Sequence, residues 1–152
     1  MEPVEQLVRK LYPKDADRIL RVLEKQVKKA KTYEVPYENI IWYKYLNLYA
    51  IYPDSIKKHK KKPLEALADH LEHIEKFGVN AVHILPFLES PLVDRGFDVK
   101  DFYKVRSDLG NLEDIKKVIK KAKDLGIRVF MDLVFNHISD QHEWFQKAQN
   151  GD

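Results

Sequence analysis

The chain has 152 residues, of which 44% are hydrophobic and 34% are charged, so it can form one packed core, and no segment reaches the roughly 18 uncharged apolar residues of a membrane span. The 27 Lys and Arg against 24 Asp and Glu give a net charge of +3, and the interspersed signs argue against a protein built around a polyanion. Because cysteine is absent, disulfide frameworks, cysteine metal sites and thiol nucleophiles are excluded.

The first forty residues predict a helical extension. The start carries Glu2 and Glu5 and no apolar signal segment, which indicates a cytoplasmic protein. Over residues 15–31, apolar side chains recur at helical spacing among lysines and glutamates, as in an amphipathic helix. Pro36 lacks a donor and restricts the residue before it. We therefore place a boundary near residues 36–40, with an extension over 1–40 and a second domain over 41–152.

From residue 41 onward, strand and helix patterns alternate. Short apolar runs at 45–52, 79–85 and 127–135 predict three strands. Pro63 suits a first helical position and Gly78 a C-terminal stop. The sequence therefore predicts a helix between the first and second strands.

Two further helices follow in the second half of the chain. Asn111 and Asp114 have the spacing of a capping box, which predicts a helix between the second and third strands. Ser139 is expected to open a last short helix. In that helix we expect Trp144 and Phe145 to pack in a core rather than to form a sugar platform. Three other histidines are expected at the surface: His59, His73 and His142.

Strands separated by helices imply an α/β fold with parallel pairing. An open doubly wound sheet and part of a closed barrel both fit the order, although a complete barrel needs about 250 residues. An open nucleotide-binding sheet would carry a glycine-rich turn after the first strand. Residues 52–55 read YPDS instead, so nucleotide binding is disfavoured.

Ligands of parallel α/β folds meet the loops at the C-terminal ends of strands. These loops contain residues 52–54, residues 86–98, and Asn136 with His137. Asp132 is placed within the third strand, where an ionised carboxylate needs a compensating partner. Asp132 is consistent with a structural ion pair or a functional acid. His137 suits a sugar hydroxyl or a structural role, and Asn136 suits a cap, a metal ligand or a loop start.

Residues 132–137 (DLVFNH) resemble the D-x-V-x-N-H segment at the third strand of glycoside hydrolase family 13, the α-amylase family. The preceding order of residues 78–86, Ser90-Pro91 and residues 96–98 supports this resemblance, which covers about residues 45–149. It implies the N-terminal portion of a (β/α)8 TIM barrel, with about three parallel strands and their helices. Residues 83–87 and 52–55, together with the Asp94–Phe97 loop, are most similar to the sucrose phosphorylase branch.

The resemblance also implies roles for five residues. His137 matches the histidine that hydrogen-bonds the glucosyl unit, and Asp94 the acid that grips distal hydroxyls of that ring. Phe97 stands where many members carry a tyrosine platform, and keeps its apolar face. Asp132 looks like the structural acid of the motif, and Asn136 like the residue that often ligates calcium in amylases.

We expect no resident cofactor or metal. The aspartate-rich calcium loop that some family members place after the first strand is replaced here by a lysine-rich run over residues 57–62. Phosphate would enter only as a co-substrate of a phosphorylase. The lysine run lacks interleaved aromatics and is expected to be a solvated loop, so we expect neither nucleic-acid nor membrane binding.

The resemblance implies retaining chemistry with two carboxylates about 5 Å apart. In the family these carboxylates follow later strands, so we assign no catalytic residue here. We expect a truncated product, an engineered fragment or one piece of a split enzyme that needs the rest of the barrel in cis or trans. The expected parent is a sucrose phosphorylase-like enzyme acting on sucrose or a related α-glucoside. The alternatives are an α-glucosidase or amylase-type hydrolase, a glucosyltransferase, and an inert carbohydrate-binding fragment.

Overall fold

The computed structural model describes residues 2–30, 41–56 and 60–151. The chain divides into two compact units, Met1–Trp42 and Tyr43–Asp152. The boundary that the sequence places near residues 36–40 lies outside the described residues. Among the described helices, none combines the length and the apolar character that crossing a bilayer requires.

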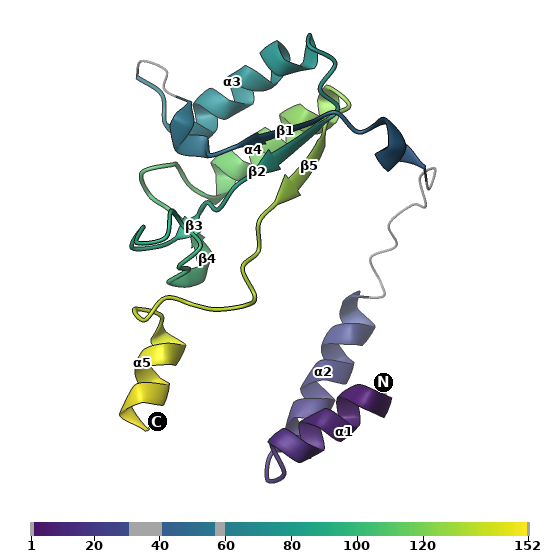
Figure 1. Cartoon of the computed structure of the whole chain (residues 1–152), viewed down its shortest axis with the longest axis vertical. Coiled ribbons are helices and arrows are strands. Elements are labelled where there is room, and N and C mark those ends of the chain that lie inside the picture. Colours follow the sequence, from purple (N-terminus) through teal and green to yellow (C-terminus); the bar gives the residue numbers. More distant parts are fainter. Residues whose placement is uncertain (1, 31–40, 57–59, 152) are drawn as a thin grey trace. The chain divides into compact units, whose positions relative to one another are not determined.

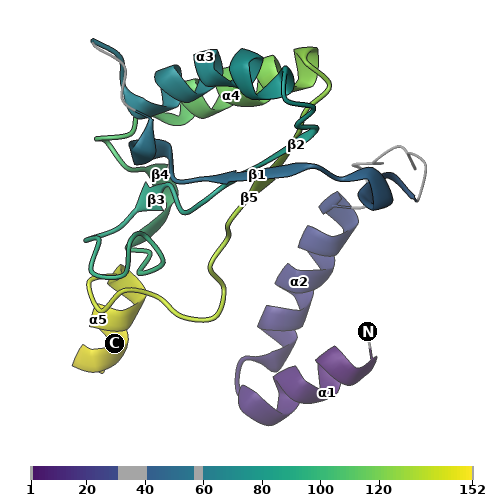
Figure 2. The ribbon, with the colours of Figure 1, turned by 45° about the horizontal axis from the view of Figure 1, so that its top comes forward.

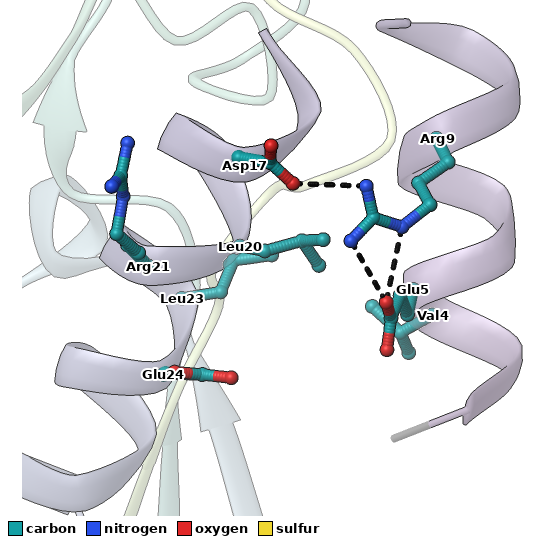
Figure 3. Close-up of a pocket in the computed structure, with 8 residues that line it drawn as sticks. All are labelled: Val4, Glu5, Arg9, Asp17, Leu20, Arg21, Leu23 and Glu24. Carbon is teal, nitrogen blue, oxygen red and sulfur yellow. Dashed lines mark hydrogen bonds and ion pairs between the residues drawn. The ribbon is translucent and has the colours of Figure 1, made fainter.

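The first unit contains two helices, α1 (Glu2–Leu11) and α2 (Ala16–Ala30). α2 confirms the predicted amphipathic helix, whereas α1 was not predicted. Val8 and Ala16 are the buried apolar side chains of the described part of this unit. Arg9 donates to Glu5 at 3.0 Å and to Asp17 at 2.9 Å beside a cavity of about 360 Å³ (Figure 3). Because these ion pairs are exposed, they add little stability to the small apolar contact between the two helices.

The second unit is built on a parallel three-stranded sheet (Figure 1). Its strands are β1 (Leu48–Ile51), β2 (Ala81–Ile84) and β5 (Arg128–Met131), in the order β1-β2-β5. Spatial order therefore follows chain order. This is the arrangement of successive barrel strands, whereas a doubly wound sheet reverses its order at a switch point.

Two helices cover one face of this sheet, α3 (Pro63–Glu75) and α4 (Leu112–Asp124) (Figure 2). Leu67, Val82 and Val118 are fully buried in the core that the two helices form with the sheet. Burying one such side chain contributes about 1.5–3 kcal/mol to the free energy of unfolding. α3 begins at Pro63 as predicted. Asn111 Oδ1 accepts from the N–H groups of Glu113 at 2.8 Å and Asp114 at 3.2 Å, which confirms the predicted cap of α4.

The three strands are shorter than the predicted runs, and 3₁₀ turns flank β1 at Trp42–Tyr45 and Pro53–Ser55. Pairing continues one residue beyond the ladder, where Leu85 N–H donates to Ile51 O and Asp132 N–H donates to Ile84 O. The next residue of the central strand is Pro86, which has no N–H to continue the ladder. Asp132 therefore lies just past β5, not within a strand as predicted.

An antiparallel hairpin occupies the stretch that the sequence presents as a polar loop. It consists of β3 (Leu88–Glu89) and β4 (Asp101–Val105), with an irregular register between Leu88 and Glu89. A two-residue strand is too short to show the alternation from which strands are predicted. The hairpin lies beyond the C-terminal ends of β1 and β2 in both views (Figures 1 and 2).

The last helix is α5 (Glu143–Asn150), which begins later than Ser139 predicted. Ser139 Oγ instead accepts from Gln141 N–H, and His142 caps the helix by accepting from Trp144 N–H at 3.1 Å. Trp144 is 57% and Phe145 43% exposed, so the prediction that they form a helix core is wrong. His142, predicted at the surface, is buried. His73 is exposed as predicted, and His59 lies outside the described residues.

Candidate functional site

Three loops meet at the edge where β1, β2 and β5 end, because parallel strands place their carboxyl ends together. The segment after β1 contains Asp54, the loop after β2 contains Asp94 and Phe97, and the segment after β5 contains His137. A backbone hydrogen bond from Ser139 N–H to Val99 O at 2.9 Å joins the loop after β2 to the segment after β5. The fold thus brings the predicted loops to one edge.

Asp94 and Phe97 belong to one tight turn, in which Phe97 N–H donates to Asp94 O at 2.9 Å. Asp94 is exposed and Phe97 is half-buried. Gly96, between them, has φ +101°, and a Cβ there would stand 3.1 Å from Pro86 Cβ and 3.2 Å from Pro86 O. Only glycine meets both the backbone angle and the close approach without strain. Gly96 therefore sets the shape of the turn.

Asp98 holds the rest of this loop. Its carboxylate accepts from Ser90 Oγ at 2.6 Å and from Val93 N–H at 2.9 Å. Burial by itself raises the pKa of Asp98, but the hydrogen bond from Ser90 and the backbone N–H donors outweigh it, so the pKa lies below its ordinary value. Asp98 is a loop anchor, and its lone pairs are already occupied by the chain.

Arg106 connects the segment after β1 to the hairpin. Its buried guanidinium donates to Asp108 at 2.9 and 3.0 Å and to Asp54 at 3.3 Å. Burial lowers the pKa of Arg106, but these hydrogen bonds outweigh burial and raise it, while the hydrogen bond from Arg106 holds the pKa of Asp108 below its usual range. Asp54 thus serves in an ion-pair network. Nearby, Arg95 lies over the Tyr52 ring at 4.6 Å.

Asp132 has the compensating partner that its position requires. Its Oδ1 lies 2.8 Å from His83 Nε2, and the two side chains are 25% and 29% exposed. His83 lies on β2, between Val82 and Ile84, which face the helical core. Side chains alternate along a strand, so His83 points to the opposite face. His83 is a residue of the site for which the sequence predicted no role. The signal was a polar residue in an otherwise apolar strand.

His137 and Asn136 are exposed neighbours, with Asn136 Nδ2 3.3 Å from His137 Nδ1. Both line a cavity of about 550 Å³ whose wall includes Phe102, Phe135 and Trp144. Asp94 and Phe97 do not line this cavity, and within the described residues no hydrogen bond or ring contact joins them to His137. The structure therefore pairs Asp132 with His83, Asn136 with His137, and Asp94 with Phe97. The convergence of all of these on one sugar stays a prediction.

The calcium-ligand role that the family resemblance implies for Asn136 stays a prediction, and so does the expected absence of a resident metal. The amide nitrogen of Asn136 faces the neighbouring imidazole, and across residues 2–30, 41–56 and 60–151 no three His, Asp or Glu side chains are grouped as metal ligands. Calcium prefers six to eight oxygen ligands. We assign no step to a metal.

Comparison with known proteins gives a consistent result for the second unit. Residues 50–152 match the family model described as alpha amylase, catalytic domain. The chain is 38% identical to maltase 1 from Drosophila virilis over 114 residues, which is 73% of this chain and 18% of that protein. It is also 38% identical to trehalose-6-phosphate hydrolase from Escherichia coli over 112 residues, 72% of this chain and 20% of that one.

The solved structures agree with the sequence matches. A MutB mutant solved in complex with the substrate sucrose has a TM-score of 0.68 and 32% identity, covering 74% of this chain and 21% of that one. The chain thus spans about a fifth of the length of these relatives. Its three parallel strands and two covering helices form part of a TIM barrel, as the sequence predicted.

Proposed function

Because this chain belongs to the α-amylase family, we propose that it is the sugar-recognising segment of an enzyme that acts on α-glucosides by a retaining mechanism. The observation that carries the proposal is the motif segment after β5, where His137 and Asn136 line a cavity at the carboxyl edge of the sheet. Active sites of barrel enzymes lie at this edge.

The residues of this chain would bind and orient a glucosyl unit. His137, exposed in the cavity wall, can donate to one hydroxyl or accept from one. Asp94 is exposed and acceptor-only when ionised, and Phe97 beside it offers an apolar face to the ring. Asp132, fixed by His83, supports the segment that carries His137.

We assign no catalytic carboxylate to this chain. A retaining mechanism needs a nucleophile and an acid/base about 5 Å apart. Asp98 is engaged by Ser90 and Val93 within its own loop, and Asp54 is paired with Arg106. The relatives are about five times longer than the matched segment, which supports the proposal that the carboxylates come from the rest of the barrel, in cis or in trans.

The main proposal is hydrolysis, because the relatives named above include a maltase and a trehalose-6-phosphate hydrolase. The sucrose phosphorylase-like parent expected from residues 83–87 and Phe97 remains the alternative. An α-glucoside such as sucrose is the proposed substrate, which the sucrose complex of one relative supports. An inert carbohydrate-binding fragment, a cytoplasmic location, and the lack of nucleic-acid or membrane partners stay predictions.

The test uses the complete enzyme that carries this segment. We expect glucose release from maltose or sucrose without phosphate, and His137→Ala should lower kcat/KM by about 100-fold or more, since a hydrogen bond made in the transition state is lost. His73→Ala, an exposed histidine on α3, is the matched control and should leave activity unchanged. Phosphate-dependent release of glucose 1-phosphate would favour the phosphorylase instead. No turnover of any α-glucoside would reject both.

A further inference from the structure

The turn that carries Asp94 and Phe97 has an unusual backbone. Its two central residues, Arg95 and Gly96, have φ +49° and +101°, and Phe97 N–H closes the turn by donating to Asp94 O at 2.9 Å. Positive φ at both central positions is typical of a type I′ turn, in which Asn, Asp and Gly are favoured. An arginine is strained there, because its Cβ comes close to the following carbonyl oxygen. The backbone of Arg95 therefore needs a compensating contact.

The compensating contact is the ring of Tyr52. The guanidinium carbon of Arg95 lies 4.6 Å from the centroid of that ring, which is within the range of a cation–π interaction. Arg95 is otherwise exposed, and Tyr52 is half-buried. Within residues 2–30, 41–56 and 60–151, the Arg95 side chain makes no hydrogen bond or ion pair. The Tyr52 ring therefore determines where this side chain lies.

Tyr52 belongs to a segment that is fixed by its own contacts. It directly follows β1, and its carbonyl oxygen accepts from Ser55 N–H at 3.0 Å in a 3₁₀ turn. Pro53 is fully buried, and Asp54 accepts from the guanidinium of Arg106 at 3.3 Å. The ring that Arg95 contacts is thus a firm anchor for the turn.

A second left-handed residue of the same loop is held in a different way. Leu92 has φ +64°, and its N–H donates to Ser90 Oγ at 2.8 Å, while Asp98 accepts from the N–H of Val93 at 2.9 Å. Hydrogen bonds within the loop therefore hold Leu92. The partner of Arg95 comes instead from the segment after β1, so this contact ties the loop after β2 to its neighbour.

We propose that Arg95 is a positioning residue of the sugar site: its guanidinium, packed on Tyr52, holds the turn so that Asp94 and Phe97 keep one orientation toward a glucosyl unit. Arg95 acts through the turn and does not touch the sugar. This inference rests on the proposed function and deepens it, because it names the contact that keeps this part of the site rigid. The competing interpretation is that the Arg95 charge binds an anionic group of the substrate directly, in which case Tyr52 is dispensable.

The first experiment measures the rigidity of the turn in the full chain, without any substrate. Asparagine tolerates the left-handed backbone, so Arg95→Asn should leave the urea midpoint unchanged or raise it. The turn should nevertheless loosen, because the contact with Tyr52 is lost. We expect the nitrogen-15 order parameters of the Asp94 and Phe97 amides to fall from about 0.85 to below about 0.6.

Variants of the tyrosine complete this measurement. Tyr52→Leu removes the ring and should loosen the turn as much as Arg95→Asn does, and the double variant should loosen it no further, since both changes break one contact. Tyr52→Phe keeps the ring and should preserve most of the rigidity. Tyr45→Leu is the matched control, at a tyrosine that is 74% exposed, and should leave the order parameters of the turn unchanged.

The second experiment measures activity in the complete enzyme. Arg95→Asn and Tyr52→Leu should each lower kcat/KM by about five- to tenfold, as expected for the loss of one cation–π contact. Tyr52→Phe should retain most of the native value. This pattern separates a positioning role from a structural one, because a residue that only stabilises the fold would change the urea midpoint as well.

Unchanged order parameters in Arg95→Asn would overturn the proposal, and so would a loosened turn with full activity. A loss of activity in Arg95→Asn without one in Tyr52→Leu would also overturn it, in favour of direct contact between the charge and the substrate. If the complete enzyme turned over no α-glucoside, the proposed function would fail, whereas the order parameters would still decide whether Arg95 holds the turn.

Discussion

His83 and Asp132 are joined by a hydrogen bond of 2.8 Å across the ends of β2 and β5. The contact is the side-chain link between the strand that leads into the Asp94–Phe97 turn and the strand that leads to His137. Both side chains are about three-quarters buried, so solvent screens the pair only in part. The pair therefore links the C-terminal ends of β2 and β5, from which the two segments with the predicted site residues begin.

Replacing His83 by Phe should destabilise the chain, because the Asp132 carboxylate loses its donor while remaining largely buried. We expect a loss of about 1–3 kcal/mol in the free energy of unfolding, measured by urea denaturation. Asp132→Asn should be milder, since the amide oxygen can still accept from His83 Nε2. His73→Phe, at an exposed position of α3, is the control. Equal midpoints for His83→Phe and the control would show that the contact contributes nothing.

The Arg106 network predicts an ordering of two acidic substitutions. Asp108→Asn should cost about 1–2 kcal/mol, since two charge-assisted hydrogen bonds to a buried guanidinium are weakened. Asp54→Asn should cost less, because Asp54 makes one longer contact of 3.3 Å. Thermal unfolding at pH 7 measures both, and the reverse order would contradict the assignment of Asp108 as the main partner.

The ion pair between Arg106 and Asp108 predicts that the stability of the fold depends on pH. The pKa of Asp108 is lowered in the folded chain, so its contribution is fully present above the unfolded-state pKa of about 3.9 and is lost as pH falls through the lower folded-state value. The stability difference between the native chain and Asp108→Asn should therefore shrink below about pH 4. Urea titrations at pH 7, 4 and 2.5 measure this difference. A constant difference over this range would be inconsistent with the shifted pKa.

Gly96→Ala should distort the turn that carries Asp94 and Phe97. The added Cβ would meet Pro86 at 3.1 Å on a backbone with φ +101°, so we expect a loss of about 2 kcal/mol or more. Gly126→Ala is the matched control, because its φ is +70° and no atom lies within 4 Å of the added Cβ. Calorimetry should rank Gly96→Ala as clearly the more harmful. Similar losses would mean that backbone strain alone matters at both sites.

Ser90→Ala should raise the pKa of Asp98. The substitution removes the 2.6 Å hydrogen bond to the carboxylate, while the burial that favours the neutral form remains. The lowered pKa of native Asp98 stabilises the fold above the unfolded-state pKa, and this contribution is lost as pH falls through the folded-state value. Carbon-13 NMR of the Asp98 carboxyl measures the shift directly. Ser107→Ala, at an exposed position, should leave that titration unchanged.

The sequence determined the three longest helices of the described residues. Helical periodicity predicted α2, α3 and α4, and local signals at Pro63 and Asn111 placed the starts of two of them. These features depend on residues three or four positions apart, so no tertiary information is needed to find them. The motif over residues 132–137 likewise predicted the family that the comparisons support.

The tertiary structure alone decided which distant side chains meet. His83 and Asp132 are 49 residues apart in sequence, and their contact depends on strand register and on which face each side chain takes. The β3–β4 hairpin was too short to leave a pattern, and the exposure of Trp144 depends on how α5 packs beside that hairpin. The spacing of nearby residues determines the helices. The candidate site depends on contacts between residues far apart in the sequence, and no local pattern encodes these contacts.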